Sequence, residues 1–417
     1  MSNLNVLISG AGIAGPVLAF WLLKAGAKVT LVERDASLRT TGQSIDIRLA
    51  GVDVIKMMGL EPEIKANHTS EHGLAFVDEM GATRALFEQT GNAKVQSFTS
   101  EYEVLRGDLA RIFVDATKER AQYIFGDQIT DLVQHGDSVE VSFQHNSKQI
   151  YDVVVAADGQ GSKLRKLAFG SDNQARIRSF DSFFAWFTVP EDLIGDKNGR
   201  WFNAPGRRLI MLRPDRLGRN HAIIGKITHG DRSAIDHLIQ AQQQGLDRFK
   251  AALEGMFKDA GWVTPKLLEI LRASEDVYGC EILQVQMDKL YRGRVVLLGD
   301  AGYCPSPLSG KGTTAAIIGA YVLAGELVSR PNDVPTALAK YQEIVGPFAK
   351  GCQAAPPGVP WIINPETAWG ISMQLCIFSW VVWLGLDKLM NLFISVPYLE
   401  GGGKFKLPEY DWTARYA

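Results

Sequence analysis

The segment at residues 10–15, GAGIAG, most constrains what this chain can fold into. It follows an apolar run at residues 4–8 (LNVLI), which is typical of a buried parallel strand, and an apolar helical pattern then continues to residue 23. A second apolar run at residues 28–32 ends at Glu33. This order of strand, glycine-rich turn, helix and strand predicts the first unit of a doubly wound α/β sheet.

The three glycines of the turn have separate roles in such a unit. Gly10 permits the tight turn, Gly12 lets a pyrophosphate approach the backbone, and Gly15 lets the helix pack against the strand. Glu33 is placed to accept hydrogen bonds from an adenosine ribose, and an acid there disfavours a 2′-phosphate. The unit therefore predicts a site for NAD or FAD rather than NADP, and the alternative is that the glycines serve packing alone.

A second glycine cluster lies near residue 300. An apolar strand at residues 294–298 runs into Gly299-Asp300, and a Pro/Ser/Gly loop then leads to an apolar helix over residues 313–327. An NAD dehydrogenase has no evident use for this second unit, whereas a longer cofactor has. Asp300 is suited to the hydroxyls of a ribityl chain, and the positive end of the helix is suited to a reduced isoalloxazine. The second cluster therefore favours FAD.

A third cluster lies between the first two. A strand at residues 152–157 precedes Asp158 in the sequence DGQGS, and upstream Arg106 precedes a predicted helix over residues 108–119. Taken alone, Asp158 fits equally well as the cap of a following helix.

Charge and cysteine content exclude several classes of protein. The 44 Lys and Arg residues nearly balance the 46 Asp and Glu residues, for a net charge of −2, which argues against nucleic acid as a partner. The four cysteines form no CxxC pair and the seven histidines are scattered, so neither a disulfide scaffold nor a metal site is predicted. The first residues show no secretory leader, and we expect a cytoplasmic protein.

Together these motifs resemble a known family. The ordered set is GAGIAG with Glu33-Arg34, then Arg106, then Asp158-Gly159, then Gly299-Asp300. It is similar to the class A flavoprotein monooxygenases, which have the para-hydroxybenzoate hydroxylase fold, over residues 1 to about 350. Within that family, GQSIDIR (residues 42–48) and the stretch over residues 299–327 most resemble the tetracycline-inactivating monooxygenases.

The resemblance implies a set of site residues. The implied FAD-binding residues are Gly10, Gly12, Ala14, Gly15, Glu33, Arg34, Arg106, Asp158, Asp300, Gly310, Gly312 and Thr313. Asp46 and Arg48 match positions near the flavin and the substrate, and they are the candidates for a catalytic role. Thr314 stands where many members carry Asn, and its hydroxyl can still donate one hydrogen bond.

The resemblance also implies an α/β fold with a Rossmann-like FAD-binding domain, an inserted antiparallel-sheet substrate domain and a C-terminal bridging helix. The FAD-binding domain is expected at residues 1–75, 100–176 and 281–355, the substrate domain at 76–99 and 177–280, and a helical segment at 356–417. Strands with alternating apolar side chains are expected to roof a pocket over the flavin. The candidate substrate contacts are Phe184, Trp186, Met211 and Pro307.

The C-terminal region allows more than one interpretation. Residues 367–386 contain 20 residues without a charge, which is long enough to cross a bilayer. We expect a buried helix that bridges the two domains, and the alternatives are peripheral membrane contact through residues 367–397 and a true membrane span.

The implied function is an FAD-dependent monooxygenase that uses NAD(P)H and O2 to hydroxylate an aromatic or polyketide-like small molecule, as in secondary metabolism. In the family the oxygen passes through a C4a-hydroperoxyflavin, and the nicotinamide is a transient co-substrate without a Rossmann domain of its own. The alternatives are an epoxidase or Baeyer–Villiger-type oxygenase on the same fold, and a flavin-binding module or reductase without oxygenation. We expect a monomer.

Overall fold

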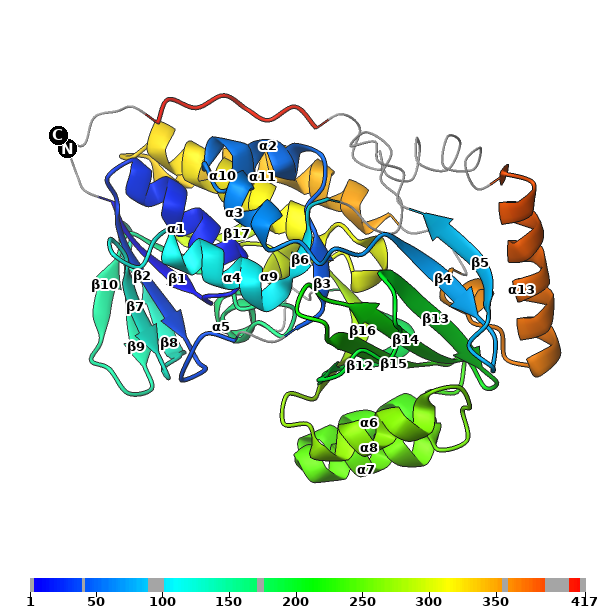
Figure 1. Ribbon diagram of the computed structural model, residues 1–417. Helices are drawn as coiled ribbons and strands as arrows, with labels where there is room; N and C mark the ends of the chain where they lie inside the picture. Colours follow the sequence, from blue (N-terminus) through cyan, green and yellow to red (C-terminus); the bar gives the residue numbers. More distant parts are fainter. Residues whose placement is uncertain are drawn as a thin grey trace.

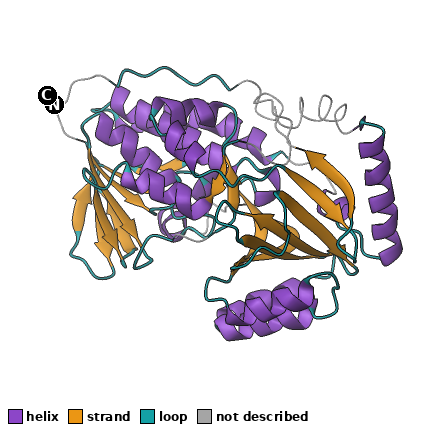
Figure 2. Cartoon of the chain, in the orientation of Figure 1, coloured by secondary structure: helices purple, strands orange, loops and turns teal. Residues whose placement is uncertain are grey.

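The computed structural model describes residues 4–39, 42–88, 101–170, 176–354, 359–386 and 405–412. The chain forms two lobes, each built on its own sheet (Figures 1 and 2). The lobe that carries the N-terminal strand is the proposed FAD-binding domain, and the other is the proposed substrate domain.

The first lobe is built on a six-stranded sheet in which every strand except the edge strand β17 is parallel. Its strand order is β17 (Tyr291–Arg292), β18 (Val295–Leu297), β11 (Val153–Ala156), β1 (Asn5–Ser9), β2 (Lys28–Glu33) and β7 (Gln122–Phe125). Both faces of the central strands are covered, which explains why these segments are apolar throughout. The predicted unit of strand, turn, helix and strand is confirmed.

Helices cover one face of this sheet (Figure 1). They are α1 (Ala14–Lys24), α2 (Ala50–Met57), α3 (Glu61–Ala66), α4 (Arg106–Asp115), α10 (Gly312–Ser329) and α11 (Val334–Gln353). The other face is covered by α5 (Lys163–Phe169) and a three-stranded sheet of β8 (Ile129–Gln134), β9 (Val139–Phe143) and β10 (Gln149–Tyr151). Among the described residues, α10 alone is long and apolar enough to cross a membrane, but it is a core helix and is mostly buried.

The second lobe is built on a seven-stranded sheet. Its order is β16 (Tyr278–Gln286), β12 (Arg176–Val189), β15 (Asn220–Ile227), β14 (Arg208–Pro214), β13 (Asn198–Ala204), β4 (Gly73–Val77) and β5 (Thr83–Glu88). Every pair is antiparallel except β13 with β4, where the β4–β5 hairpin joins the edge of the sheet in the parallel direction. One face packs on α6 (Ser233–Gln243), α7 (Leu246–Phe257) and α8 (Thr264–Ala273). We call the opposite face the open face.

Short elements connect the two lobes. A two-stranded sheet pairs β3 (Ser44–Asp46) with β6 (Glu103–Leu105). The glycine-rich stretch near residue 300 forms α9 (Asp300–Tyr303) and a 3-10 turn, η1 (Pro307–Ser309), before α10 begins. Helix α12 (Val359–Ile363) places Trp361 against the open face of the seven-stranded sheet.

The C-terminal region contains the helices α12 and α13, as expected of a helical region, and its described residues 405–412 are not helical. The region contacts the two lobes in separate places. Helix α13 (Ala368–Trp383) packs beside β5 and β13, with Leu375, Phe378 and Val382 against the open face (Figure 1). Residues 405–412 return to the first lobe, where Trp412 packs on Trp21. The described parts of the C-terminal region thus contact the substrate sheet through α13 and the first lobe through residues 405–412.

Candidate functional site

The glycines of the first turn lie in two different environments. An added Cβ on Gly10 would lie 2.4 Å from the carbonyl oxygen of Ala157, and one on Gly15 would lie 2.1 Å from that of Gly10. These two glycines are explained by packing. An added Cβ on Gly12 would meet only the Nη2 atom of Arg106, at 3.7 Å. Open space therefore lies above Gly12, as a cradle for a pyrophosphate requires.

Glu33 lies at the carboxyl end of β2, beside this turn. Its Oε2 atom accepts a hydrogen bond from the backbone N–H of Ala11 at 2.9 Å, and its Oε1 atom accepts one from Asp35 at 3.2 Å. The predicted contact of Glu33 with a ribose stays a prediction. The side chain of Arg34 is exposed and lies 3.6 Å from Asp35, so its predicted contact with the cofactor rests on the resemblance alone.

Asp300 lies near Arg106, close enough for the charge of Arg106 to act on its carboxyl. An added Cβ on Gly312, the first residue of α10, would lie 3.8 Å from Oδ1 of Asp300. Asp300 is accessible to solvent, yet desolvation by the surrounding protein raises the pKa of its carboxyl, and the charge of Arg106 opposes that rise. The backbone N–H of Arg106 donates to the carbonyl of Gln43 at 3.0 Å, which holds the backbone of Arg106 in place.

Asp46 and Arg48 lie at the N-terminal end of α10. The Nε atom of Arg48 donates to Asp46 at 2.7 Å, and its backbone N–H donates to the hydroxyl of Thr314 at 2.9 Å. An added Cβ on Gly310 would lie 3.8 Å from the Arg48 guanidinium. Thr313 lies half-buried in the first turn of α10. The two catalytic candidates therefore lie beside the second glycine cluster, although their role stays a prediction.

Asp158 has a structural role that the sequence left open. Its carboxylate accepts hydrogen bonds from the Ser162 hydroxyl and from the backbone N–H groups of Lys163 (2.9 Å) and Leu164 (3.2 Å). These groups belong to the start of α5, where Ser162 is the N-cap residue. The backbone of Asp158 lies against Gly10. Its capping of α5 is thus observed, and a contact with the cofactor stays a prediction.

The predicted roof residues share the open face of the substrate sheet. Phe184 and Trp186 are buried in one apolar cluster, against which Met211, Trp361 and Leu308 of the 3-10 turn also pack. Leu308 places the cluster beside the second glycine loop. Pro307, the fourth predicted contact, is exposed on that loop. Their contact with a substrate stays a prediction.

Two further residues, Tyr278 and Cys280, pack against this cluster, and the motifs did not reveal them. Tyr278 stacks on Trp186 with ring centroids 5.1 Å apart, and its hydroxyl accepts a hydrogen bond from the backbone N–H of Gln43 at 3.0 Å. Burial raises the pKa of Tyr278, and it raises that of the Cys280 thiol to about 11. Cys280 is therefore a neutral thiol at pH 7. The alternation of side chains along β16, which puts Tyr278 and Cys280 on one face, was the available signal.

A buried charge cluster also joins the lobes. Arg213 of β14 lies 2.8 Å from Glu71 and 2.6 Å from Glu103 of β6, and Asp46 is the register partner of Glu103. Burial, reinforced by the charges of Glu71 and Asp46, raises the pKa of Glu103 to about 8, although Arg213 opposes the rise. Arg213 lies two residues beyond Met211, so strand alternation predicts its face but not its partners.

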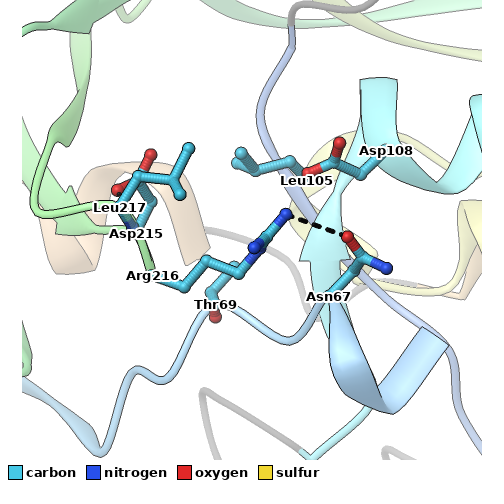
Figure 3. A pocket seen from close by; sticks show the side chains of 7 residues that line it. All are labelled: Asn67, Thr69, Leu105, Asp108, Asp215, Arg216 and Leu217. Carbon is cyan, nitrogen blue, oxygen red and sulfur yellow. Dashed lines mark hydrogen bonds between the residues drawn. The ribbon is translucent and has the colours of Figure 1, made fainter. Parts of the chain in front are cut away.

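Two hollows lie away from the predicted cofactor residues. The smaller, of about 10 Å³, lies between the loop after α3 and the loop after β14, where Arg216 donates to Asn67 at 3.0 Å (Figure 3). It has room for about one water molecule. The larger, of about 360 Å³, lies beside it and is lined by polar residues such as Ser70 and Asp192. Within the described ranges, no group of three or more His, Cys, Asp and Glu residues could hold a metal ion.

Comparisons with known proteins agree with this geometry. Residues 3–353 match the model of the FAD binding domain family. The chain is 35% identical to the FAD-dependent monooxygenase asL4 of Sarocladium schorii, over 98% of this chain and 99% of that protein. It is 34% identical to the monooxygenase CTB7 of Cercospora beticola, over 99% and 98% of the two chains. The crystal structure of tetracycline destructase Tet(51) superposes with a TM-score of 0.78 at 28% identity, over 99% of this chain and all of that one.

Proposed function

The chain belongs to the FAD binding domain family and is an FAD-dependent monooxygenase, and from this premise we propose that it hydroxylates an electron-rich aromatic or polyketide-like small molecule. The observation that carries the proposal is the open space above Gly12. The Nη2 atom of Arg106 borders this space, and the charge of Arg106 also acts on Asp300. Leu308, in the loop before α10, packs against the apolar roof. A cofactor above Gly12 and an apolar substrate under the roof would thus bind next to each other.

The residues present fit FAD. Gly12 offers backbone without a side chain for the pyrophosphate, and Glu33 would hold the ribose of the adenosine. Arg106 and Asp300 would hold the ribityl and pyrophosphate region, and the N-terminal end of α10 would lie beside the flavin ring. When bound, FAD supplies the redox chemistry with O2 that amino acid side chains lack.

The chain's own groups would position and protect the reaction. The α10 N-terminus, at Gly312, would offer a positive helix end to the negative charge of a reduced flavin. The aromatic roof of Phe184 and Trp186 excludes water from the substrate's side of the site. Asp46 and Arg48 form a charged pair beside this end of α10, which suits them to orient polar groups of the substrate or cofactor.

We propose NADPH or NADH as a transient co-substrate, because the chain carries a single complete GxGxxG unit and that unit is assigned to FAD. Epoxidation, Baeyer–Villiger insertion and flavin reduction without oxygenation are the competing reactions. The likeness to tetracycline destructase makes tetracyclines one class to test, beside phenols and aromatic polyketides.

The experiment measures NADPH and NADH oxidation by the purified flavoprotein across this panel under ¹⁸O2. Hydroxylation predicts a product with one added ¹⁸O atom and an intact carbon skeleton, formed in proportion to the nicotinamide oxidised. Ring expansion of a ketone or an epoxide product would favour the competing oxygenations. Substrate-independent production of H2O2 alone would contradict oxygenation.

A pair of variants tests the cofactor assignment. Asp300→Asn keeps the shape of the side chain but removes its charge beside Arg106, and we expect at least a tenfold loss of FAD occupancy or turnover. Asp288→Asn is the matched control, because Asp288 is exposed and pairs with exposed Arg176 at the surface. A fully flavinated and fully active Asp300→Asn variant would remove Asp300 from the site.

We propose that the chain is a cytoplasmic monomer whose α13 makes peripheral membrane contact. The observation that favours contact is the outer face of α13, where Trp369, Trp380 and Trp383 are 73%, 57% and 75% exposed. The remainder of the predicted contact segment, residues 387–397, lies outside the described residues. The whole-molecule test is given in the Discussion.

A further inference from the structure

Three tryptophans gather at the open face of the substrate sheet, and their indole N–H groups differ. Trp201 donates to the side chain of Asn203 at 2.8 Å, and Trp361 donates to the carbonyl of Thr228 at 3.0 Å. The Nε1 atom of Trp186 is buried without a partner among the described residues, although the side chain is only 5% exposed. Of these three indole groups, that of Trp186 is therefore the one without an acceptor among the described residues.

Neighbouring aromatic rings restrain the orientation of the Trp186 indole and therefore of its unpaired N–H group. The ring of Trp186 stacks on Tyr278 at an interplanar angle of 11°, and it meets Phe184 edge to face at 6.1 Å. Tyr278 is itself held by the backbone of Gln43 from the first lobe. A buried N–H without an acceptor costs free energy, and native structures rarely keep one without a reason. The surroundings fix this donor in place, so the missing acceptor points to a ligand.

We propose that the indole N–H of Trp186 donates a hydrogen bond to a carbonyl or hydroxyl oxygen of the substrate, and so selects oxygenated aromatic compounds over hydrocarbons of the same shape. The inference rests on the proposed function, since it deepens the assignment of the open face as the substrate's side. An indole N–H is a donor only, so the matching group is an acceptor. The rest of the cluster around it, including Met211 and Leu308, is apolar and suits a planar ring system.

The selection follows from the cost of leaving the donor unpaired. A ligand that supplies an oxygen pairs the N–H, whereas a hydrocarbon buries it against apolar atoms. We expect a preference of about 10-fold to 100-fold for the oxygenated ligand, as is typical when one buried hydrogen bond is gained.

The first test observes the donor directly in the holoenzyme. The protein is labelled with ¹⁵N-tryptophan, and the Trp186 indole resonance is assigned by its absence in Trp186→Phe. We expect 1-tetralone to shift this resonance downfield and tetralin, which lacks the oxygen, to leave it in place. The resonances of Trp201 and Trp361 should respond equally to both compounds. An equal response of Trp186 to the two compounds, or no response to either, overturns the proposal.

The second test uses matched variants. Trp186→Phe keeps an aromatic ring against Tyr278 but removes the N–H, and Trp201→Phe removes an N–H that already has a partner. We expect Trp186→Phe to abolish the preference for 1-tetralone over tetralin and to keep its FAD content, and Trp201→Phe to keep the preference. An unchanged preference in Trp186→Phe, or loss of FAD from it without a change in preference, overturns the proposal.

The outcome is separable from that of the proposed function. A shift of the Trp186 resonance by 1-tetralone without any ¹⁸O-labelled product across the panel would contradict hydroxylation and leave the donor assignment standing. Hydroxylation coupled to nicotinamide oxidation, together with a Trp186 resonance that responds equally to both compounds, would support the proposed function and contradict the donor assignment.

Discussion

An added methyl group would have different consequences at the three glycines of the first turn. At Gly10 and Gly15 it would collide with backbone atoms and impair folding, whereas at Gly12 it would fill the space proposed for the cofactor. Gly15→Ala would place a Cβ 2.1 Å from a backbone oxygen, so we expect it to lower the free energy of unfolding by about 3 kcal/mol or more. Gly12→Ala meets only one flexible guanidinium, at 3.7 Å. We expect the free energy of unfolding of this variant to lie within about 0.5 kcal/mol of the native value. We expect its FAD occupancy to fall at least tenfold. Thermal unfolding of the apoprotein and the flavin-to-protein absorbance ratio measure the two effects.

The control is Gly255→Ala, at an exposed position inside α7 where an added Cβ would meet nothing within 4 Å. It should stabilise the helix by about 0.5–1 kcal/mol and leave FAD binding unchanged. A Gly12→Ala variant that retains FAD would show that the open space above this turn is not the cradle.

Glu103 makes stability depend on pH with a definite sign. Its pKa in the folded protein is raised to about 8, above the ordinary value of 4.5, because the carboxyl is buried beside other acids. Between these two pH values the folded protein holds a proton that the unfolded chain has released. The stabilisation that protonated Glu103 gives the folded state is therefore complete below about pH 4.5 and is lost as pH rises through about 8. The free energy of unfolding falls over this range with a slope of at most about 1.4 kcal/mol per pH unit.

Replacing Glu103 by Gln removes this proton, so we expect the free energy of unfolding to fall less steeply between pH 5 and 8 than in the native chain. Urea unfolding at several pH values measures the slope. Glu101→Gln is the matched control, because Glu101 is exposed and pairs with Lys65 at the surface. Identical slopes in the native chain and Glu103→Gln would show that Glu103 is ionised across this range.

Among the elements, the parallel strands and the helices α1 and α10 were predictable because their signals are local. An apolar run flanked by glycines indicates a buried element from its own residues, without information from distant parts of the chain. Helix α4 was predicted over residues 108–119 but spans Arg106–Asp115, since tertiary contacts rather than propensity set its ends. The cluster of Arg213, Glu71 and Glu103 was not predictable, because its members lie 32 to 142 residues apart and no local pattern pairs them.

The C-terminal strap, residues 405–412, depends on one glycine of α10. An added Cβ on Gly325 would lie 2.2 Å from the ring of Tyr410, whose hydroxyl donates to buried Glu326 at 2.8 Å. We expect Gly325→Ala to displace the strap and to make the C-terminus cleavable by trypsin at Lys406 at least tenfold faster. Gly346→Ala in α11, where an added Cβ would meet nothing within 4 Å, should leave cleavage unchanged. Equal cleavage in the two variants would show that the strap is not held by this contact.

For the whole molecule, the proposed site lies where the two lobes meet, and its residues differ in how far the sequence could predict them. The glycine turn, Glu33, Arg106 and Asp300 lie in sequence motifs, and in the structure Arg106 lies beside Gly12 and near Asp300. Tyr278 and Gln43 are 235 residues apart and meet only because the lobes pack together. Contacts across the lobes thus lay beyond any local pattern. Trp186 and Met211 share one apolar cluster, and their contact with a substrate stays a prediction.

The outer face of α13 gives the last prediction, which concerns the behaviour of the whole molecule at a lipid surface. One side of α13 packs on the substrate sheet through Phe378, and the other exposes three tryptophans without a charged residue in the helix. Tryptophan is favoured at the boundary between lipid and water, so we expect the native protein to float with phosphatidylcholine vesicles in a sucrose gradient. Trp380→Glu with Trp383→Glu should lower the bound fraction at least tenfold and leave FAD content unchanged. The matched control is Leu217→Glu, which changes an exposed apolar residue in the loop after β14. Native protein that stays at the bottom of the gradient, as a monomer by light scattering, would exclude the membrane contact.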